Sequence, residues 1–580
     1  MCGIIGYVGY RRAAEVISDS LKRLEYRGYD SVGLAVLNEK GLEVRKDKGM
    51  VNDVATALHF TTMEGNIGIG HTRWATHGTV CMENAHPHLD CTRNIVIAHN
   101  GVIENFASLR QELINKKHSF ASDTDSEIVA HLIEENAKSH PLFKAFLKSV
   151  QALAGSYAIV ALSAADKEGR LFVARKNSPL VIGVGKGEMF CASDIPAMLK
   201  YTKTFVPLEE GDVAVLTRGG YKVYSLDGSE ATRKQITVDW DVEMAQKGGY
   251  PHFMLKEIND QKHFVNESLA ADVEKISALI EKYDRIDIIA AGTSYHAGLM
   301  LAYLLQEKGK MAQAFIASDY PFIARPDKKT LIVAISQSGE TADVLQAIRY
   351  AKSKSCKIAA ITNVVASTIT TLADEVVLLN AGPEIGVAAT KTFTSQLAVI
   401  YKLVYGKARL SEIPHLMDTM LEKEKEIKKI AAKLADKENA FFIARGKSVP
   451  IAYEGSLKFK EITYIHSEAY PGGELKHGTL SLISEGVPVI ALAPKDETLP
   501  KLFGNIKEAK ARGALIVSLT NDDEVKKESD FSISLPTIAD PVLYPFVLIV
   551  PLQLLAYHVS VLRGINPDRP RNLAKSVTVE

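Results

Sequence analysis

The stretch that decides the fold is LIVAISQSGET, residues 331–341. Five apolar residues form the pattern of a short buried strand, the polar turn 336–340 follows, and an amphipathic helix pattern runs over 341–352. Short apolar runs that alternate with amphipathic helices are typical of a parallel sheet covered on both faces. This stretch therefore predicts an α/β doubly wound domain around itself.

The same rhythm recurs elsewhere in the chain. The segment IDIIAAGTS at 286–294 has the pattern of the preceding strand. AFFIARG at 440–446 resembles the segment at 286, and VPVIALA at 487–493 resembles the segment at 331. The second copy lacks the Ser-rich turn of the first, so the copies share a fold but not their turn chemistry. We infer two tandem doubly wound domains at 251–420 and 431–580, joined by a helical connector.

The first part of the chain, 2–235, has a different pattern. Short apolar runs such as 32–37, 95–98 and 157–162 are bounded by Gly, Asn or charged residues, with some helical patterns between them. These features predict an α+β domain with mostly antiparallel strands. The polar segment 236–250, which ends in Gly-Gly, is the predicted linker.

Composition narrows the function classes. The chain has 580 residues, which at roughly 150 per domain suggests about four folding units. Lys plus Arg and Asp plus Glu are both 69, so the formal charge is zero. A chain without net positive charge has no overall electrostatic attraction to a nucleic acid or an anionic membrane, so neither is the expected partner. Five cysteines, an odd and low count, fit a reducing compartment, and we expect a cytoplasmic protein.

Membrane and secretory segments are not expected. The first residues lack the basic and apolar regions of a secretory signal. The uncharged stretch 542–562 is long enough to cross a bilayer, but it contains Pro545, Pro551, Gln553 and His558. We interpret it as a buried strand end followed by a core helix.

Cys2 is the first candidate for chemistry. Removal of Met1 is favoured when the next residue is small, and it would leave a thiol and a free α-amine on one residue. An α-amine ordinarily titrates at about pH 7.7–8.0, which suits a general base at neutral pH. One residue would then supply nucleophile and base, as in N-terminal nucleophile hydrolases.

Three further features of this part favour a site around Cys2. Arg73, in the polar and aromatic segment 71–78, could hold a carboxylate bidentately. Asn100 and Gly101 could form an oxyanion hole, although Asn-Gly is also the commonest hairpin turn. Asp123 or Asp125 could bind an ammonium group, and the alternative is that the aspartate caps the helix that follows.

The turn 336–341 could bind phosphate. Hydroxyl and N–H groups at a helix N-terminus bind phosphate without Lys or Arg, and Thr293 and Ser294 occupy the equivalent place after the preceding strand. Ligands of doubly wound sheets bind at these carboxyl ends of strands. The alternative is that these polar residues only cap the two helices that follow and bind no phosphate.

The second copy carries a candidate proton-transfer group. Glu454, Lys458 and Glu461 share one helix face, which alone predicts a surface salt-bridge ladder. A Gly-bounded loop holds His477, and a carboxylate and a histidine near a sugar phosphate suit proton transfer. Lys575, in a C-terminal tail, could form a Schiff base if it is held dry.

A zinc site is a weaker possibility. Cys81, His86, His88 and Cys91 could in principle bind zinc, but their spacing is irregular for a known zinc module, so we set it aside.

Taken together, these segments resemble glutamine–fructose-6-phosphate transaminases (isomerising), over essentially the whole chain. The matching segments are 23–31, 71–78, 336–343, 384–387, 473–478 and 570–580. The resemblance implies a class II glutaminase domain of the N-terminal nucleophile type, followed by two sugar isomerase (SIS) domains. It implies that L-glutamine and D-fructose 6-phosphate become L-glutamate and D-glucosamine 6-phosphate, the first step of hexosamine synthesis, with ammonia passing internally.

The resemblance also implies roles for individual residues. Cys2 would form a glutamyl thioester, with Asn100 and Gly101 as oxyanion hole. Glutamine would be held by Arg73 and Asp125 with Thr76 and His77 nearby, and Trp74 would gate the ammonia channel. The sugar phosphate would be bound by Thr293, Ser294, Ser336, Gln337, Ser338, Thr341 and Val387. Lys575 would form the Schiff base, Glu461 would move a proton between C1 and C2, and His477 would assist ring opening.

Further expectations follow from the same resemblance. The family uses no metal and no cofactor for this chemistry, and it is typically a homodimer in which the histidine loop reaches the neighbouring subunit's site. Many members have Asn where this chain has His296, and Ala-Ala where it has Pro471 and Gly472. The second difference makes the cross-subunit role of His477 the least secure.

Two other classes stay open. Another N-terminal-cysteine amidotransferase, such as amidophosphoribosyltransferase, would need an acidic diphosphoribose-binding loop, which the second half lacks. A sugar-phosphate-binding regulator with catalytically silent SIS domains would have no reason to keep both Cys2 and Lys575.

Overall fold

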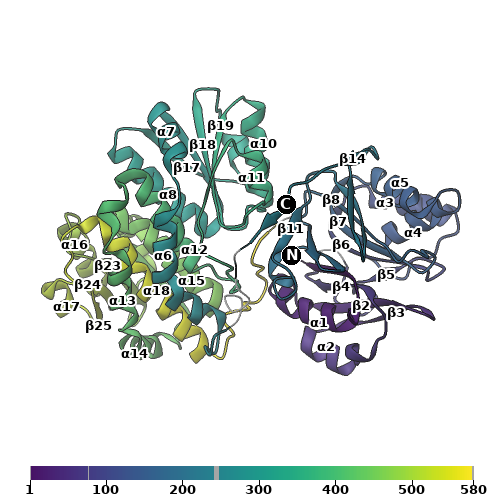
Figure 1. Ribbon diagram of the computed structural model, residues 1–580. Coiled ribbons are helices and arrows are strands. Elements are labelled where there is room, and N and C mark those ends of the chain that lie inside the picture. Colours follow the sequence, from purple (N-terminus) through teal and green to yellow (C-terminus); the bar gives the residue numbers. More distant parts are fainter. Residues whose placement is uncertain (1, 76–77, 239, 241–246, 578–580) are drawn as a thin grey trace.

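The computed structural model of the protein describes residues 2–75, 78–238, 240 and 247–577. Figure 1 shows two lobes, an N-terminal lobe in purple and blue and a C-terminal lobe in teal, green and yellow, with the last part of the chain crossing between them. Seven of the fifteen residues of the predicted linker, 239 and 241–246, lie outside the described residues. The predicted domain limits at 235, 250 and 420 stay predictions.

The N-terminal lobe is built on two antiparallel sheets. The first has the order β15-β11-β9-β10-β1-β4-β2-β3, with bounds β1 Gly3–Val8, β2 Ser31–Asn38, β3 Gly41–Lys48, β4 Ile67–Arg73, β9 Val181–Gly185, β10 Glu188–Ala192, β11 Thr204–Pro207 and β15 Ile236–Thr237. The second has the order β14-β13-β12-β8-β7-β6-β5, with bounds β5 His88–Leu89, β6 Ile95–Ile103, β7 Gly155–Ser163, β8 Leu171–Lys176, β12 Val213–Thr217, β13 Gly220–Tyr224 and β14 Glu230–Ala231.

Helices cover the outer face of each sheet. One apolar core lies between the sheets, a second between the first sheet and its helices, and a third between the second sheet and its helices. The helices are α1 Ala13–Leu24, α2 Val51–Ala57, α3 Phe106–Asn115, α4 Glu127–Ala137 and α5 Leu142–Gln151. The predicted α+β fold with antiparallel strands is confirmed.

The C-terminal lobe contains two parallel five-stranded sheets with the same strand order, β17-β16-β18-β19-β20 and β22-β21-β23-β24-β25. The strands of the first are β16 Arg285–Ala290, β17 Met311–Ile316, β18 Thr330–Ser336, β19 Lys357–Thr362 and β20 Glu375–Leu378. Those of the second are β21 Asn439–Ala444, β22 His466–Pro471, β23 Pro488–Ala493, β24 Leu515–Thr520 and β25 Phe531–Ser534. The shared order confirms the predicted repeat.

Helices lie on both faces of these sheets, as expected for strands that are apolar on both sides. In the first repeat they are α6 Phe253–Ala270, α7 Glu274–Lys282, α8 Gly292–Glu307, α9 Tyr320–Ile323, α10 Ala342–Ser353, α11 Thr368–Leu372 and α12 Lys391–Tyr405. The connector consists of α13 Ile413–Leu421 and α14 Glu424–Leu434. The second repeat has α15 Val449–Thr463, α16 Leu499–Lys510, α17 Asp523–Glu528 and α18 Tyr544–Leu562.

Helix α18 contains most of the uncharged stretch 542–562, for which the sequence predicted a buried strand end followed by a core helix. It is long and apolar enough to cross a bilayer, but 89% of its most apolar window is buried inside the protein. It packs on α13, α14 and α15, which explains why every side of it is apolar. The predicted core helix is confirmed. The predicted strand end is wrong, because 541–543 is a 3₁₀ turn that leads into the helix.

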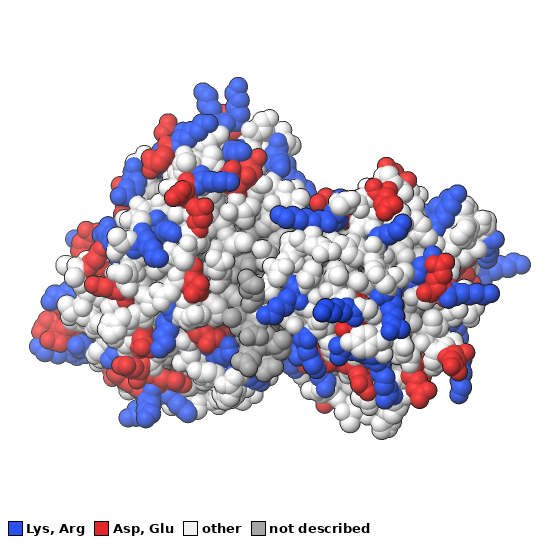
Figure 2. All heavy atoms as spheres, in the orientation of Figure 1, with Lys and Arg blue, Asp and Glu red and all other residues white. Residues whose placement is uncertain are grey.

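Charged side chains of both signs are interspersed over the face seen in Figure 2. The two lobes meet along a waist, and the C-terminal tail, residues 563–577, passes through it. Tail residues bond to both lobes: Tyr29 Oη of the N-terminal lobe donates to the carbonyl of Pro570 at 3.0 Å, and Tyr464 Oη accepts the N–H of Arg571 at 2.7 Å.

Candidate active site

Cys2 directly precedes the central strand β1, beside the end of β4. Its Sγ accepts the N–H of Trp74 at 3.2 Å and donates to the Trp74 carbonyl at 3.4 Å. Burial raises the pKa of the Cys2 thiol, and the Trp74 amide together with Arg73 and Arg27 offsets this only in part. A thiol in this state needs a base before it can attack a carbonyl carbon.

Asn100 is held against Cys2 from the second sheet. Its Nδ2 donates to the Cys2 carbonyl at 3.0 Å, and its Oδ1 lies 3.0 Å from Nε2 of His71. That nitrogen also faces the His99 carbonyl at 3.1 Å, so two acceptors require it to carry the proton. Burial lowers the pKa of His71 to about 3, so the neutral ring orients the amide nitrogen of Asn100 toward Cys2.

Gly101 does not form the hairpin turn that its pairing with Asn100 favoured. Both residues lie inside β6, opposite Tyr157 and Ala158 of β7, so the turn alternative is wrong. Gly101 has φ +127°, and a Cβ there would lie 2.1 Å from the carbonyl oxygen of Ser156. Only glycine fits this kinked strand position.

Asp125 does not cap α4, so that alternative is also wrong. Its Oδ2 accepts the N–H of Ile103, at the end of β6, at 2.8 Å, and Oδ1 accepts from Ser126 Oγ at 3.3 Å. Arg73 is buried at the end of β4 and donates to the carbonyls of Gly78 and Thr79, both at 3.2 Å. Thr76 and His77 lie outside the described residues.

A pocket in the C-terminal lobe gathers most of the residues proposed for sugar phosphate. It opens at the carboxyl ends of β16 and β18, and helix α15 of the second repeat and the C-terminal tail close it. Its lining includes Thr293, Ser294, Gln337, Ser338, Thr341, Val387, Lys458, Glu461 and Lys575. Ser336 lies just behind, where its Oγ accepts the N–H of Gly339 at 3.1 Å and lies 3.2 Å from Thr341 Oγ1.

Glu454, Lys458 and Glu461 do not form a surface ladder. Lys458 and Glu454 are at most 1% exposed, and Nζ of Lys458 lies 2.5 Å from Glu461 and 3.4 Å from Glu454. Lys458 also donates to Thr293 Oγ1 at 3.1 Å. Burial alone would lower the pKa of Lys458, but the carboxylates of Glu454 and Glu461 outweigh it and raise the pKa.

This buried network joins the two repeats. Thr293 Oγ1 donates to Glu454 Oε1 at 3.0 Å, and His296 Nδ1 lies 2.8 Å from Glu454 Oε2. The predicted surface salt-bridge ladder is wrong because the polar face of α15 packs against α8 of the first repeat. Glu461, which is 20% exposed on its side chain, is the carboxylate of this network that reaches the pocket.

Lys575 is enclosed at the other side of the pocket. Its Nζ forms an ion pair with Glu384 and donates to the Gly386 carbonyl at 2.8 Å. Burial alone would raise the pKa of Glu384, but Lys575 and donors from Thr390 and Thr392 lower it to about 2. Lys575 therefore has a buried partner, not one on the surface.

Two more ionisable groups stand behind this pair. Glu257 on α6 accepts the N–H groups of Ile385 and Gly386 at 2.5 and 3.2 Å, and burial together with the charge of Glu384 raises its pKa to about 7. Burial lowers the pKa of Lys391 to about 8, and its Nζ lies 4.0 Å from the ring centroid of Phe264.

His477 is not brought to this pocket within the single chain. It ends a 3₁₀ segment, Gly472–His477, and its side chain is exposed. The segment lies against α16, where Arg445 donates to Asn505 Oδ1 at 3.0–3.1 Å beside Gly473.

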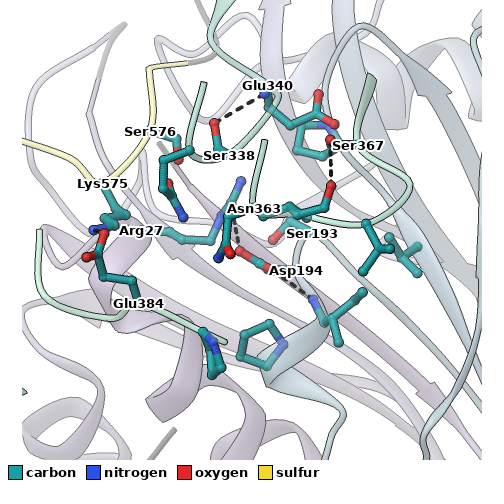
Figure 3. A pocket seen from close by; sticks show the side chains of 18 of the residues that line it. Arg27, Ser193, Asp194, Ser338, Glu340, Asn363, Ser367, Glu384, Lys575 and Ser576 are labelled. Atoms are coloured by element: carbon teal, nitrogen blue, oxygen red, sulfur yellow. Dashed lines mark hydrogen bonds and ion pairs between the residues drawn. The ribbon is translucent and has the colours of Figure 1, made fainter. Parts of the chain in front are cut away.

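A second pocket lies between the lobes and shares Gln337, Ser338, Lys575 and Ser576 with the first. Figure 3 shows Lys575 and Glu384 at one end of it and, further in, Arg27 and Asp194 of the N-terminal lobe, where Arg27 Nη1 donates to Asp194 Oδ2 at 3.0 Å. Arg27 Nε also donates to the Cys2 carbonyl at 3.1 Å. Arg27 therefore touches Cys2 on one side and lines the interlobe pocket on the other.

The tail gives a second connection between the two regions. Trp74, whose backbone bonds to Cys2, packs edge-on against Tyr29 with ring centroids 5.4 Å apart. Tyr29 bonds to Pro570, five residues before Lys575. A short series of contacts therefore leads from Cys2 to the tail.

Sequence reasoning missed part of the site. Glu384 lies in the segment 384–387, which resembles the family, and the available signal for its role is an isolated acid between apolar runs. Glu257 gave no signal, because its position on a mixed helix resembles that of any surface glutamate. The sequence places Lys458 on the same helix face as Glu454 and Glu461, but it does not indicate that Lys458 lies in the site.

Comparisons with known proteins agree with this architecture. Residues 71–200 match the glutamine amidotransferase domain family, and residues 279–405 and 433–563 each match the SIS domain family. A solved structure, the C-terminal domain of glucosamine-fructose-6-phosphate aminotransferase from Francisella tularensis, is 38% identical, with a TM-score of 0.52 over 56% of this chain and 99% of that one.

These matches define an enzyme class in which a glutamine amidotransferase domain precedes two SIS domains. Relatives named glutamine–fructose-6-phosphate aminotransferase (isomerizing) from Pyrococcus horikoshii and Thermococcus kodakarensis are 49% and 48% identical, each covering all of both chains. The chain belongs to the glutamine–fructose-6-phosphate aminotransferase (isomerizing) family.

Proposed function

We propose that the protein converts L-glutamine and D-fructose 6-phosphate to L-glutamate and D-glucosamine 6-phosphate, with ammonia passing from the first site to the second. The observation that carries the proposal is the position of the C-terminal tail. Lys575 shares a pocket with hydroxyls suited to phosphate, and the same tail contacts Tyr29, which packs on Trp74 beside Cys2.

The first half-reaction takes place at Cys2. After removal of Met1 the α-amine accepts the thiol proton, and Sγ attacks the side-chain carbonyl carbon of glutamine. Asn100 Nδ2 and the N–H of Gly101 stabilise the oxyanion, while Arg73 and Asp125 hold the α-carboxylate and α-amine. Ammonia leaves with the amine's proton, and water hydrolyses the thioester to glutamate. Thr76 and His77 complete this site, and Trp74 gates the passage of ammonia.

The second half-reaction takes place in the pocket of the C-terminal lobe. Thr293, Ser294, Ser336, Gln337, Ser338, Thr341 and Val387 form the sugar-phosphate site. The hydroxyls and N–H groups at the start of α10 take the phosphate.

The carbon chemistry needs one amine and one carboxylate. Lys575 condenses with the C2 ketone of the open sugar, releasing water, and ammonia then displaces the lysine to leave a C2 imine. Glu461 removes a proton from C1 and a proton is delivered to C2, while the C1 hydroxyl proton passes to the nitrogen, which gives the C1 aldehyde and the C2 amine. Lys458, between Glu454 and Glu461, holds Glu461 in place.

The protein acts as a homodimer in the cytoplasm. In a dimer the exposed loop of His477 is free to reach the neighbouring subunit's sugar site and to assist ring opening. A dimer in sedimentation, with loss of sugar turnover but not of glutaminase activity in His477→Ala, would support this arrangement; a fully active monomer would contradict it.

The reaction is tested by assaying glucosamine 6-phosphate from glutamine and fructose 6-phosphate, with glutamate measured in parallel. Equal yields of the two products are expected. Another N-terminal-cysteine amidotransferase would form glutamate without this amino sugar, and a catalytically silent sugar-phosphate regulator would form neither. Either result would overturn the proposal.

A further inference from the structure

A cluster of metal-ligating side chains lies in the N-terminal lobe, outside the groups used by the reaction. Cys91 belongs to the turn between β5 and β6, His118 follows α3, and His131 and Glu134 are one turn apart on α4. One ligand atom from each lies within 4.8 Å of all the others. We propose that these four residues form a structural zinc site.

The separations match a tetrahedral site. Zinc binds thiolate at about 2.3 Å and imidazole or carboxylate at about 2.0–2.2 Å, so neighbouring ligand atoms lie roughly 3.3–3.6 Å apart. Cys91 Sγ lies 3.5 Å from His118 Nδ1 and 3.4 Å from His131 Nδ1. Glu134 Oε2 lies 3.0 and 3.3 Å from the same two nitrogens.

The outer nitrogens of the two histidines have partners of their own. His118 Nε2 lies 3.1 Å from Glu135 Oε2, and His131 Nε2 lies 3.4 Å from Glu127 Oε1. A histidine that binds a metal through one ring nitrogen typically donates the other N–H to a carboxylate, which fixes the tautomer. Both histidines are arranged in this way.

The hydrogen-bonding capacity of the two rings also fits a metal. Each imidazole has a carboxylate oxygen at both nitrogens, and the two side chains are only 3% and 1% exposed. A neutral ring carries only one N–H, so it can donate to only one of its two carboxylates. With zinc bound, each Nδ1 gives its lone pair to the ion and each Nε2 donates its proton to the outer carboxylate.

The ligand set is mixed in a way that suits zinc. One thiolate, two imidazoles and one carboxylate are all ligands that zinc accepts, and four protein ligands close a structural site. The Cys91 thiol releases its proton to solvent on binding. The site differs from the irregular set of four considered from sequence, since only Cys91 is shared, and His86 stacks instead on His71 with centroids 4.0 Å apart.

The position of the site indicates what the ion does. It ties together three separate segments of the lobe: the turn before β6, the loop after α3 and helix α4. Glu127, which faces His131, also accepts the N–H groups of Ala121 and Ser122, both at 2.7 Å. These bonds hold the loop that ends at Asp125, so the zinc stabilises this loop and takes no part in the reaction.

The test uses the full-length protein, stripped with a chelator and then titrated with zinc against a chromophoric competitor. One equivalent per chain is expected for the wild type and for the matched control Cys81→Ser. Cys91→Ser should lose that equivalent, and Glu135→Gln should bind roughly 10- to 100-fold more weakly. With cobalt in place of zinc, the thiolate-to-metal absorption should appear in the control and vanish in Cys91→Ser.

Two outcomes would overturn the proposal. One is a stripped wild-type protein that takes up no zinc. The other is equal binding by Cys91→Ser and Cys81→Ser, which would place the ion elsewhere, for example at Cys2. Since Cys91 is exposed, its replacement by serine should leave the fold intact, and circular dichroism checks this.

Discussion

Lys575 and Glu384 form an ion pair whose two side chains are 4% and 0% exposed. Nζ cannot attack a ketone while it is engaged with Glu384, because the attack needs a free lone pair. The sugar phosphate must therefore separate the pair before Lys575 reacts. The tail already encloses Lys575 in this structure.

Replacing this lysine by arginine separates chemistry from charge. We expect Lys575→Arg to keep the pair with Glu384 and the fold but to lose glucosamine 6-phosphate formation. Borohydride with fructose 6-phosphate should trap an adduct on Lys575 in the wild type and in the exposed control Lys527→Arg. Near-normal product formation by Lys575→Arg would refute the Schiff-base role.

Glu257 gives a pH prediction. Its folded pKa of about 7 lies above the unfolded value of about 4.3, so between these values the folded state holds more protons and stability falls as pH rises. The loss from this group is at most on the order of 4 kcal/mol. Glu257→Gln should lack that part of the loss between pH 5 and 8, measured by chemical denaturation.

The control for this experiment is Glu267→Gln, an exposed glutamate on the same helix. It should follow the wild type at both pH values. An unchanged pH dependence in Glu257→Gln would mean that Glu257 is already ionised in the folded protein.

Ser338 and Thr341 should control the affinity for phosphate. A hydroxyl bonded to a charged group contributes roughly 1.5–3 kcal/mol, so Ser338→Ala and Thr341→Ala should each raise KM for fructose 6-phosphate by roughly 10- to 150-fold. Basal glutaminase activity should persist in both. Ser353→Ala, at the exposed end of α10, is the matched control; an unchanged KM in both test variants would place the phosphate elsewhere.

Cys2 should be essential for glutamine but not for the sugar. We expect Cys2→Ala to abolish glutamine hydrolysis and glutamine-dependent synthesis, while binding of fructose 6-phosphate survives. Cys81→Ala should retain both activities. Mass spectrometry should find Met1 absent from active protein, and full glutaminase activity with Met1 retained would contradict the terminal-amine mechanism.

Arg175 should couple the lobes. Its guanidinium donates to Leu208 and Thr368 and lies 3.8 Å from Glu340, in the turn that carries Ser338. Arg175→Gln leaves the buried Glu340 without this partner and should loosen the contact, so more ammonia escapes. The yield of glucosamine 6-phosphate per glutamate should fall, whereas Arg170→Gln, within the N-terminal lobe, should leave it unchanged.

Much of the fold could be predicted from the sequence because its signals are local. The apolar strand at 331–335 and the helix after it are specified by neighbouring residues, and so is the copy at 487–510. The predicted strand end at 542 is wrong because a local signal can be ambiguous: an apolar run of this kind does not distinguish a strand from a buried helix.

The site could be predicted only where chemistry and position coincide in the sequence. The hydroxyls at 336–341 follow a strand, so their place at the sheet edge is readable. The burial of Lys458 and Glu454 depends on contact between helices about 150 residues apart, and no local pattern reports that. The zinc cluster was missed because its residues belong to three segments that meet only in the folded lobe.

The equal strand order of the two repeats has an evolutionary consequence. Helices α8 and α15 are counterparts, each following the first strand of its repeat, and both face one pocket. With the phosphate bound at 336–341, as proposed, the hydroxyls of this turn are needed once for the two repeats. The counterpart at 494–498 is released from that selection, so divergence between descendants should be greater there than at the turn it once mirrored.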